Sequence, residues 1–269
     1  LTHPSKKVDL TLGYYYKRLN MIENFVDIQT KDGICDTFTV RPDENGPFPA
    51  IIIYMDAPAI REELRDMARR LASMGYFVLL PNLFYRVGKE NSYPFDFSKI
   101  REDKTQFSAM IKTMDDTTNS LVISDTSSLL EYLETNSDVI KGNYGAVGYC
   151  MSGQYIVSIA SAYPNSFKTL ASFYGVKIYT DQDDSPHLKA SDISADLYLA
   201  FAEHDTWVDE DLLSKIKIHF TKNTPNFKME IYEGTEHGFA FPDRHTYNKA
   251  AAEKHWSRLN TLFEKNLKN

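Results

Sequence analysis

Three residue types that together perform nucleophilic catalysis stand in one order along the chain, as Cys150, Asp205 and His237. A nucleophilic cysteine needs a base that takes its proton or holds it as a thiolate, and the base needs an acid that orients it. Each of the three follows a segment with the apolar pattern of a strand. Because the loops after parallel strands open at one edge of a sheet, we expect these side chains to converge there. The order and spacing predict a Cys-His-Asp site for acyl transfer.

Cys150 lies in a stretch with the layout of a nucleophile elbow, in which a strand turns sharply into a helix. Gly148, Ser152 and Gly153 supply the small residues that such a turn needs, because the strand and the helix approach closely. The serine form of the motif has glycine at position 152, so this stretch is a variant with cysteine as the candidate nucleophile. The motif alone is equally compatible with a buried structural cysteine, since free cysteine packs as a small hydrophobe.

Other residues compete for these roles. His204 adjoins Asp205, but its position predicts a surface or capping residue, and Asp209 is the reserve acid. Ser152 is expected inside the start of the helix, facing packing. Cys35 is expected to be structural, because two cysteines make no disulfide framework. Solvated surface positions are expected for the remaining histidines: His3, His187, His219, His245 and His255.

The elements that must position these residues alternate between strand and helix, which predicts a mostly parallel sheet with helices on both faces. Segments 25–29 and 35–41 form a predicted hairpin around an Asp-Gly turn. Further strands are expected at 50–54, 76–80, 144–149, 170–174, 197–202 and 228–232, and helices at 60–74, 117–135, 155–163, 209–220 and 246–265. We expect one α/β domain over residues 1–269.

Two regions depart from this rhythm. Residues 1–20 show no clear period and are expected to form an N-terminal arm. Residues 87–117 form a long connection with scattered aromatic residues, in which short helices can form and which is a candidate lid or pocket insertion.

The composition excludes several classes of function. The chain has 269 residues, 42% of them hydrophobic and 25% charged, with a formal net charge of −7. An acidic balance without a basic cluster argues against nucleic-acid binding. No apolar run approaches the roughly 20 residues that span a bilayer, and residues 1–12 lack an apolar signal core. We therefore expect a cytoplasmic protein, either monomer or homodimer, that acts on a small molecule.

Four stretches together carry a family resemblance: PNLFYR at 81–86, GYCMSG at 148–153, EHDTWV at 203–208 and GTEHGF at 234–239. In order and spacing, from about residue 26 to 263, the chain resembles the dienelactone hydrolase (carboxymethylenebutenolidase) family. The resemblance implies an α/β-hydrolase fold whose Cys-His-Asp triad opens small lactones or esters without a metal or organic cofactor.

The resemblance also implies the individual roles. Cys150 would attack the carbonyl carbon, His237 would act as base and then acid, and Asp205 would orient His237. The backbone N–H groups of Met151 and Ala57 would form the oxyanion hole.

For substrate binding, the resemblance places Arg86 on a substrate carboxylate. Asp56 stands where the family has a glutamate that pairs with the resting thiol. The sequence departs from the family at Ser152, at Phe241 in place of a second substrate arginine (with Arg244 three residues later), and in the connection before residue 117. An uncharged or aromatic ester would suit the expected aromatic wall of Tyr85, Trp207, Phe239 and Phe241.

Two other functions remain open from the sequence. The altered motif and the missing arginine are also compatible with a non-catalytic, hydrolase-like small-molecule binding or sensor protein. A thiol redox role for Cys150 lacks a nearby resolving cysteine in the sequence. Turnover of small esters separates the first alternative from catalysis, and a reversible oxidised state of Cys150 separates the second.

Overall fold

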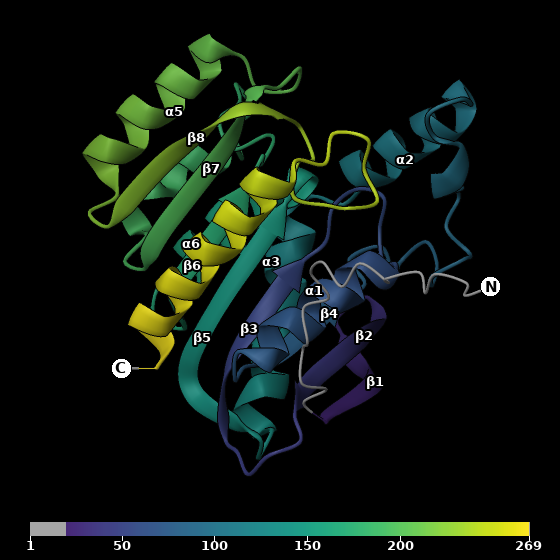
Figure 1. Cartoon of the computed structure of the whole chain (residues 1–269), viewed down its shortest axis with the longest axis vertical. Helices are drawn as coiled ribbons and strands as arrows, with labels where there is room; N and C mark the ends of the chain where they lie inside the picture. Colours follow the sequence, from purple (N-terminus) through teal and green to yellow (C-terminus); the bar gives the residue numbers. More distant parts are fainter. Residues whose placement is uncertain (1–19, 269) are drawn as a thin grey trace, which may run out of the picture.

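A computed structural model describes residues 20–268, in which eight strands form one sheet with helices on both sides (Figure 1). The strand order is β1-β2-β4-β3-β5-β6-β7-β8. The pairs β1–β2 and β2–β4 are antiparallel, and all other neighbours are parallel. The strands are β1 (Met21–Thr30), β2 (Gly33–Pro42), β3 (Phe48–Tyr54), β4 (Phe77–Pro81), β5 (Val139–Tyr149), β6 (Phe167–Phe173), β7 (Asp196–His204) and β8 (Phe227–Glu236).

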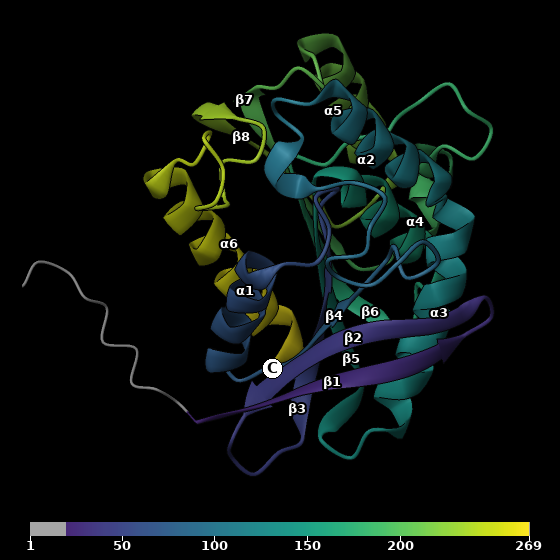
Figure 2. The ribbon, with the colours of Figure 1, turned by 90° about the vertical axis from the view of Figure 1, so that its right-hand side faces the viewer.

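The helices cover the two faces of this sheet. Figure 2 shows α1 and α6 on one face and α3 and α4 on the other. The α-helices are α1 (Glu62–Ser73), α2 (Lys104–Asp116), α3 (Asn119–Thr135), α4 (Gly153–Ala162), α5 (Glu210–Asn223) and α6 (Lys249–Leu267), and the 3₁₀ helices are η1 (Phe97–Lys99), η2 (Cys150–Ser152) and η3 (Pro186–Asp192). The α/β fold class predicted from the sequence is confirmed.

The central strands are buried on both sides, which explains their continuous apolar runs. All seven residues of β3 and all five of β4 are buried, as are the last six residues of β5. A parallel sheet with helices on both faces leaves no polar face, so alternating patterns are absent there. The sheet therefore holds the carboxyl ends of β3, β5, β7 and β8 in fixed positions relative to one another.

The connection from β5 through α4 to β6 is unusually tight. A methyl group added at Gly153 would lie 2.3 Å from the Cα of Gly175, in the loop after β6. One added at Gly148 would lie 2.5 Å from the side chain of Ile156 on α4. Real Cβ atoms do not approach other atoms this closely. The glycines at these positions therefore let α4 begin directly above the sheet.

One helix was not predicted as such. The connection 87–117 contains α2, a helix of 13 residues that begins after Asp103, whose side chain accepts hydrogen bonds from the N–H groups of Thr105 and Gln106. Only three of its residues are buried, Met110, Thr113 and Met114. Such a narrow buried face produces a weak helical period in the sequence. The strand β5 also begins earlier than predicted. The expected N-terminal arm falls on residues that, up to 19, lie outside the described part of the chain.

We predict that Gly153→Ala lowers the free energy of unfolding by about 2 kcal/mol or more, because overpacking a close contact typically costs 1–3 kcal/mol and this contact involves backbone on both sides. The control is Gly142→Ala, a position with φ of 68° and open space around it. Backbone strain alone should cost about 1 kcal/mol there. Urea denaturation of both variants checks this, and equal losses would contradict the packing explanation.

Candidate active site

Cys150 is held in a strained backbone conformation at the carboxyl end of β5. Its φ of 53° lies in the left-handed region, which is uncommon for a residue with a side chain. The N–H of Val176, in the loop after β6, donates to the Cys150 carbonyl at 2.9 Å and helps to hold the turn. This conformation turns the side chain away from the strand, and Cys150 is partly exposed at a cavity. These are the features of a nucleophile elbow.

His237 and Asp205 meet at the neighbouring strand ends. Asp205 follows β7 and His237 follows β8, and their side chains join through Nδ1 and Oδ2 at 2.8 Å. The Asp205 side chain is fully buried and also accepts from the Trp207 N–H at 2.9 Å. Because a carboxylate can only accept, Nδ1 of His237 carries the proton. The buried Nε2 has no hydrogen-bond partner among residues 20–268, and Cys150 borders the same cavity as this ring.

The electrostatics of the site favour the protonated form of His237. Burial alone would lower the pKa of His237, but the negative charge of Cys150 and the hydrogen bond to Asp205 outweigh it and raise that pKa to about 10. The histidine is therefore an imidazolium at neutral pH. Cys150 lies at the amino end of η2 and α4.

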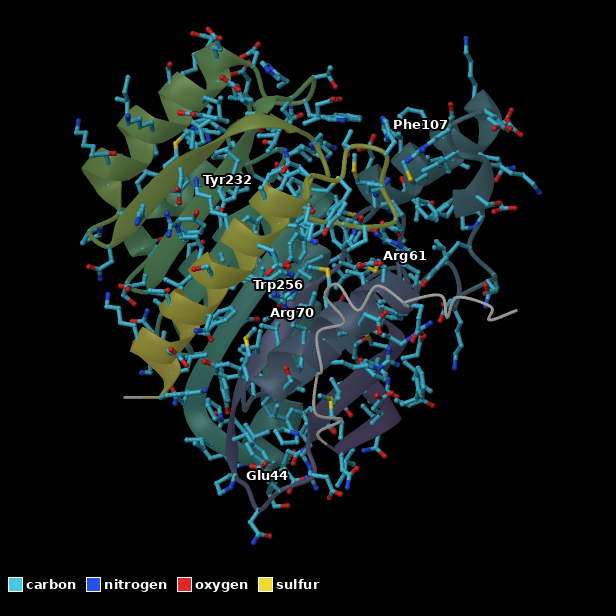
Figure 3. The ribbon with its side chains drawn as sticks, viewed as in Figure 1. Glu44, Arg61, Arg70, Phe107, Tyr232 and Trp256 are labelled. Atoms are coloured by element: carbon cyan, nitrogen blue, oxygen red, sulfur yellow. The ribbon has the colours of Figure 1, made fainter. Side chains whose placement is uncertain are left out.

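Cys150 and His237 line a cavity of about 610 Å³ together with Ala57 and Trp207. Much of its wall is apolar and comes from α2, on which Figure 3 shows Phe107. The other apolar residues of this wall are Ile100, Met110, Ile111, Met114 and Val176. Its cationic residues are Arg101, Lys104 and Arg244. The connection predicted as a pocket insertion thus supplies a large part of the wall.

A larger hollow, of about 920 Å³, lies between α1 and α6. Arg70 and Trp256 line it and lie side by side, with the guanidinium carbon 4.4 Å from the centre of the indole ring (Figure 3). None of Cys150, Asp205 and His237 borders this hollow, so its size does not make it the reaction site.

Asp56 binds two arginines instead of the thiol. Its buried carboxylate accepts from Arg61 at 2.6 and 3.1 Å and from Arg244 at 2.8 Å. Burial opposes ionisation of Asp56, but the two guanidinium groups outweigh it and lower its pKa. Arg61 lies just before α1 (Figure 3). This network leaves the expected pairing of Asp56 with Cys150 without support and makes Asp56 an anchor of the loop after β3.

Arg86 is likewise engaged elsewhere. Its guanidinium donates to both carboxylate oxygens of the buried Asp125 on α3, at 2.7 and 2.9 Å, and to Asp32 at 2.7 Å. It does not border the cavity of Cys150. The substrate-carboxylate contact expected for Arg86 therefore has no support in this structure.

The expected aromatic wall is only partly in place. Trp207 lines the cavity and is 46% exposed. Phe239 is fully buried against Tyr174 and Tyr232, and Phe241 is fully buried against Tyr149. Neither borders the cavity, and neither does Tyr85, whose hydroxyl bonds with Thr30 and Asp125. The apolar wall comes from α2 in their place.

Sequence reasoning missed two neighbours of the candidate triad. Tyr174, at the end of β6, packs edge-on against the His237 ring with centroids 5.1 Å apart. Ser152 is fully buried, and its hydroxyl donates to the carbonyl of Met55 at 2.5 Å. The only signal for Tyr174 was its position before Gly175 at a strand end. Ser152 is expected from the sequence to face packing, but its partner in the loop after β3 has no signature in the sequence.

The surface positions predicted for His187 and His255 are wrong. His255 is completely buried, its Nε2 lies 2.8 Å from the Tyr149 hydroxyl, and burial lowers its pKa to about 3. His187 stacks on Tyr179 at 3.6 Å and is 7% exposed. A neutral imidazole packs as an aromatic ring, so helical spacing alone does not reveal its environment. His204 and His245 are exposed and His219 is half-buried, whereas His3 lies outside the described residues.

Known proteins resemble the chain in sequence and in structure. The model of the family described as "Dienelactone hydrolase family" matches residues 35–267. A Synechocystis sp. protein named "Putative carboxymethylenebutenolidase" is 28% identical over 236 residues, 86% of this chain and 92% of that protein.

Two solved structures share the fold. The structure of a "Putative Dienelactone Hydrolase" from Klebsiella pneumoniae has a TM-score of 0.77 at 21% identity and covers 90% of this chain and 98% of its own. That of a dienelactone hydrolase from Anabaena variabilis has a TM-score of 0.63 at 15% identity and covers 92% and 99%.

No helix within residues 20–268 has the length and apolarity needed to cross a membrane. Within the same residues, no group of three or more His, Cys, Asp or Glu side chains has a metal-binding arrangement.

We predict that Asp205→Asn lowers ester hydrolysis by roughly 10²-fold, the lower end of what a positioned acid–base group contributes. It should also shift the alkaline limb of the pH profile of kcat/KM to lower pH. The carboxylate helps to raise the pKa of His237 to about 10, so without it the imidazolium loses its proton earlier as the pH rises.

The control is Asp209→Asn, because Asp209 only caps α5 by accepting from the Leu212 N–H. The measurement is kcat/KM from pH 6 to 10.5 with spontaneous hydrolysis subtracted. An alkaline limb that moves in the Asp209 variant, or stays in place in the Asp205 variant, would contradict the assignment.

We predict that Asp56→Asn lowers the free energy of unfolding by about 3 kcal/mol, because it leaves two guanidinium groups without a buried counter-charge. The folded-state pKa of Asp56 is lowered, so its contribution is present above the ordinary value of 3.8 and is lost as the pH falls through the folded value. The deficit of the variant should therefore shrink in acid.

The control here is Asp66→Asn, since Asp66 forms an exposed pair with Arg69 that should contribute less than about 1 kcal/mol. Denaturation at pH 7 and pH 3.5 compares the two variants. Equal losses at pH 7 would show that the buried network does not hold the loop.

Proposed function

The chain belongs to the dienelactone hydrolase family and is a hydrolase of carboxylic esters or lactones, and on this premise we propose that Cys150 is the nucleophile, His237 its acid–base partner and Asp205 the residue that orients it. One observation carries the proposal above the others. The ring of His237 binds Asp205 through Nδ1 at 2.8 Å, and the ring borders the same cavity as the strained Cys150.

In the acylation step, the Cys150 thiolate adds to the carbonyl carbon of the ester or lactone. The carbonyl electrons move to the oxygen, which the N–H groups of Met151 and Ala57 stabilise. As the tetrahedral intermediate collapses, the C–O bond of the leaving group breaks and the imidazolium of His237 protonates the departing oxygen. The product is a thioester on Cys150, and in a lactone the freed hydroxyl stays attached to the acyl chain.

In the deacylation step, water attacks the thioester carbon. Neutral His237 takes the proton of the water, and its imidazolium is stabilised by Asp205 throughout. When the second intermediate collapses, the C–S bond breaks and the carboxylic acid leaves. The thiolate and the imidazolium then form again as a pair, so the resting state is restored without another reactant.

The residues that line the cavity suit a small substrate with an apolar or aromatic portion. Phe107, Met110 and Met114 border the same cavity as Cys150, and Trp207 borders it near His237. Arg101 and Lys104 also border the cavity, and neither forms an ion pair within the part of the chain that the structure describes. The cavity is therefore bordered by these residues and not by Arg86 and Phe239, which we expected there. Within the expected pocket insertion, α2 is the part that supplies most of these residues.

We predict that Cys150→Ala abolishes hydrolysis of p-nitrophenyl acetate and of small lactones while the protein stays folded. The chain has two cysteines, and Cys35 provides the matched control. The Cys35 side chain is buried in β2 against Thr37, and burial raises its pKa to about 12, so it is no nucleophile. Cys35→Ala should keep most of the activity at a small loss of stability.

The test is steady-state turnover by both variants and the natural chain, with circular dichroism as the check on folding. Activity that survives in Cys150→Ala would overturn the mechanism. Absence of turnover by the natural chain across a panel of esters and lactones would favour a binding or sensor protein.

A further inference from the structure

Ser152 links two segments whose relative position matters for the proposed reaction, the loop after β3 and the elbow at Cys150. The pairing of β3 with β5 ends at Tyr54 opposite Gly148. Beyond that point the two chains separate, one into the loop that starts at Met55 and the other into the elbow at Cys150. The buried hydroxyl of Ser152 donates to the Met55 carbonyl at 2.5 Å, so it continues the link past the end of the sheet.

The loop on the far side of this bond carries Ala57, one of the two N–H groups assigned to the oxyanion hole. Ala57 is 3% exposed and borders the cavity with Cys150. Two residues before it, the Met55 carbonyl is held by Ser152. One residue before it, Asp56 is held by Arg61 and Arg244. Two sets of contacts therefore hold the loop. Of these, the hydrogen bond from Ser152 connects the loop directly to the elbow that carries the proposed nucleophile.

The other oxyanion donor lies on the elbow itself. Met151 stands between Cys150 and Ser152 in η2. The hydroxyl of Ser152 thus connects the turn that carries the sulfur and the Met151 N–H to the loop that carries the Ala57 N–H. A glycine at position 152, as in the usual form of the motif, has no atom that makes this bond.

We propose that Ser152 is a positioning residue for ester and lactone hydrolysis, whose hydroxyl sets the distance between the two halves of the oxyanion hole. The inference rests on the proposed function, because it assigns a use to a bond beside the same nucleophile. Ser152 touches neither the substrate nor the sulfur, and acts through the Met55 carbonyl. Its removal should weaken stabilisation of the oxyanion while leaving the thiolate–imidazolium pair intact.

Two reactions of Cys150 separate these effects. Alkylation by iodoacetamide forms a C–S bond, releases iodide and develops no oxyanion, so it reports only on the thiolate. Reversible addition of phenylacetaldehyde forms a C–S bond to the carbonyl carbon, moves the C=O electrons to the oxygen and places that oxygen at the oxyanion position. The His237 imidazolium can supply the proton that completes the hemithioacetal.

For Ser152→Ala, we expect kcat for a small ester to fall about 10- to 100-fold, the range that a misplaced oxyanion donor produces. The affinity for phenylacetaldehyde should fall by a similar factor. The rate of alkylation should stay within about twofold of that of the natural chain, since the ion pair is retained. Ser152→Gly, measured in the same way, provides the second variant if Ser152→Ala does not fold.

Thr224→Val is the matched control for a purely structural loss. The Thr224 hydroxyl is also buried and donates to a backbone carbonyl, that of Ala190, at 2.9 Å. Its removal should lower the free energy of unfolding and leave kcat and aldehyde affinity unchanged. Thermal unfolding of all variants shows whether loss of rate follows loss of stability.

Three outcomes overturn the proposal. The first is a Ser152 variant with the kcat and aldehyde affinity of the natural chain. The second is a fall in alkylation that matches the fall in kcat, which would place the effect on the thiol. The third is an inactive natural chain, which contradicts the proposed function and removes the inference that rests on it. The first two occur only with an active natural chain, so they reject the role of Ser152 alone.

Discussion

The left-handed turn at Cys150 is the constraint that organises the surrounding structure. Cys150, with φ of 53°, directly follows the last residue of β5 and is the first residue of η2. Space for that turn exists only because Gly148 and Gly153 have no side chains, and because the backbone at Gly175 can approach α4 closely. A strained residue persists when its neighbours over-determine it. Here those neighbours are the buried strands β3 and β6 on either side of β5.

Two buried carboxylates, those of Asp205 and Asp56, bind different parts of the site. Asp205 accepts from His237, whose ring borders the same cavity as Cys150. Asp56 accepts from Arg61 and Arg244 and fixes the loop after β3. Both carboxylates are buried, and each has charged or N–H donors that offset the cost of burial. His237 and the loop after β3 therefore have separate supports.

Much of this arrangement could be predicted from the sequence because it depends on local patterns. The apolar runs identified the buried strands. Three of them are followed by Cys150, Asp205 and His237; Asp205 bonds to His237, and Cys150 and His237 border one cavity. Parallel pairing brings strand ends to one edge, so convergence required no knowledge of distant contacts. The narrow buried face of α2 explains why the wall of the cavity escaped the same reasoning.

Roles that depend on partners from distant elements could not be predicted. Arg86 has the residue type that suits a substrate carboxylate, yet Asp125 on α3 takes up its guanidinium. Asp56 has the position of a thiol partner, yet two arginines surround it. Periodicity likewise gave no sign that His255 would be enclosed among aromatic rings. In each case a single ion pair or packing contact across the fold decides the role.

The central claim is that hydrolysis passes through a thioester on Cys150, and the mass of the enzyme during turnover tests it most directly. The measurement is rapid acid quenching of enzyme with a slowly deacylated ester, followed by intact mass analysis and peptide mapping. If Cys150 is acylated, the peptide that contains it should gain the acyl mass, formed and lost at rates compatible with turnover. Turnover without any adduct, or an adduct on another residue, would contradict it.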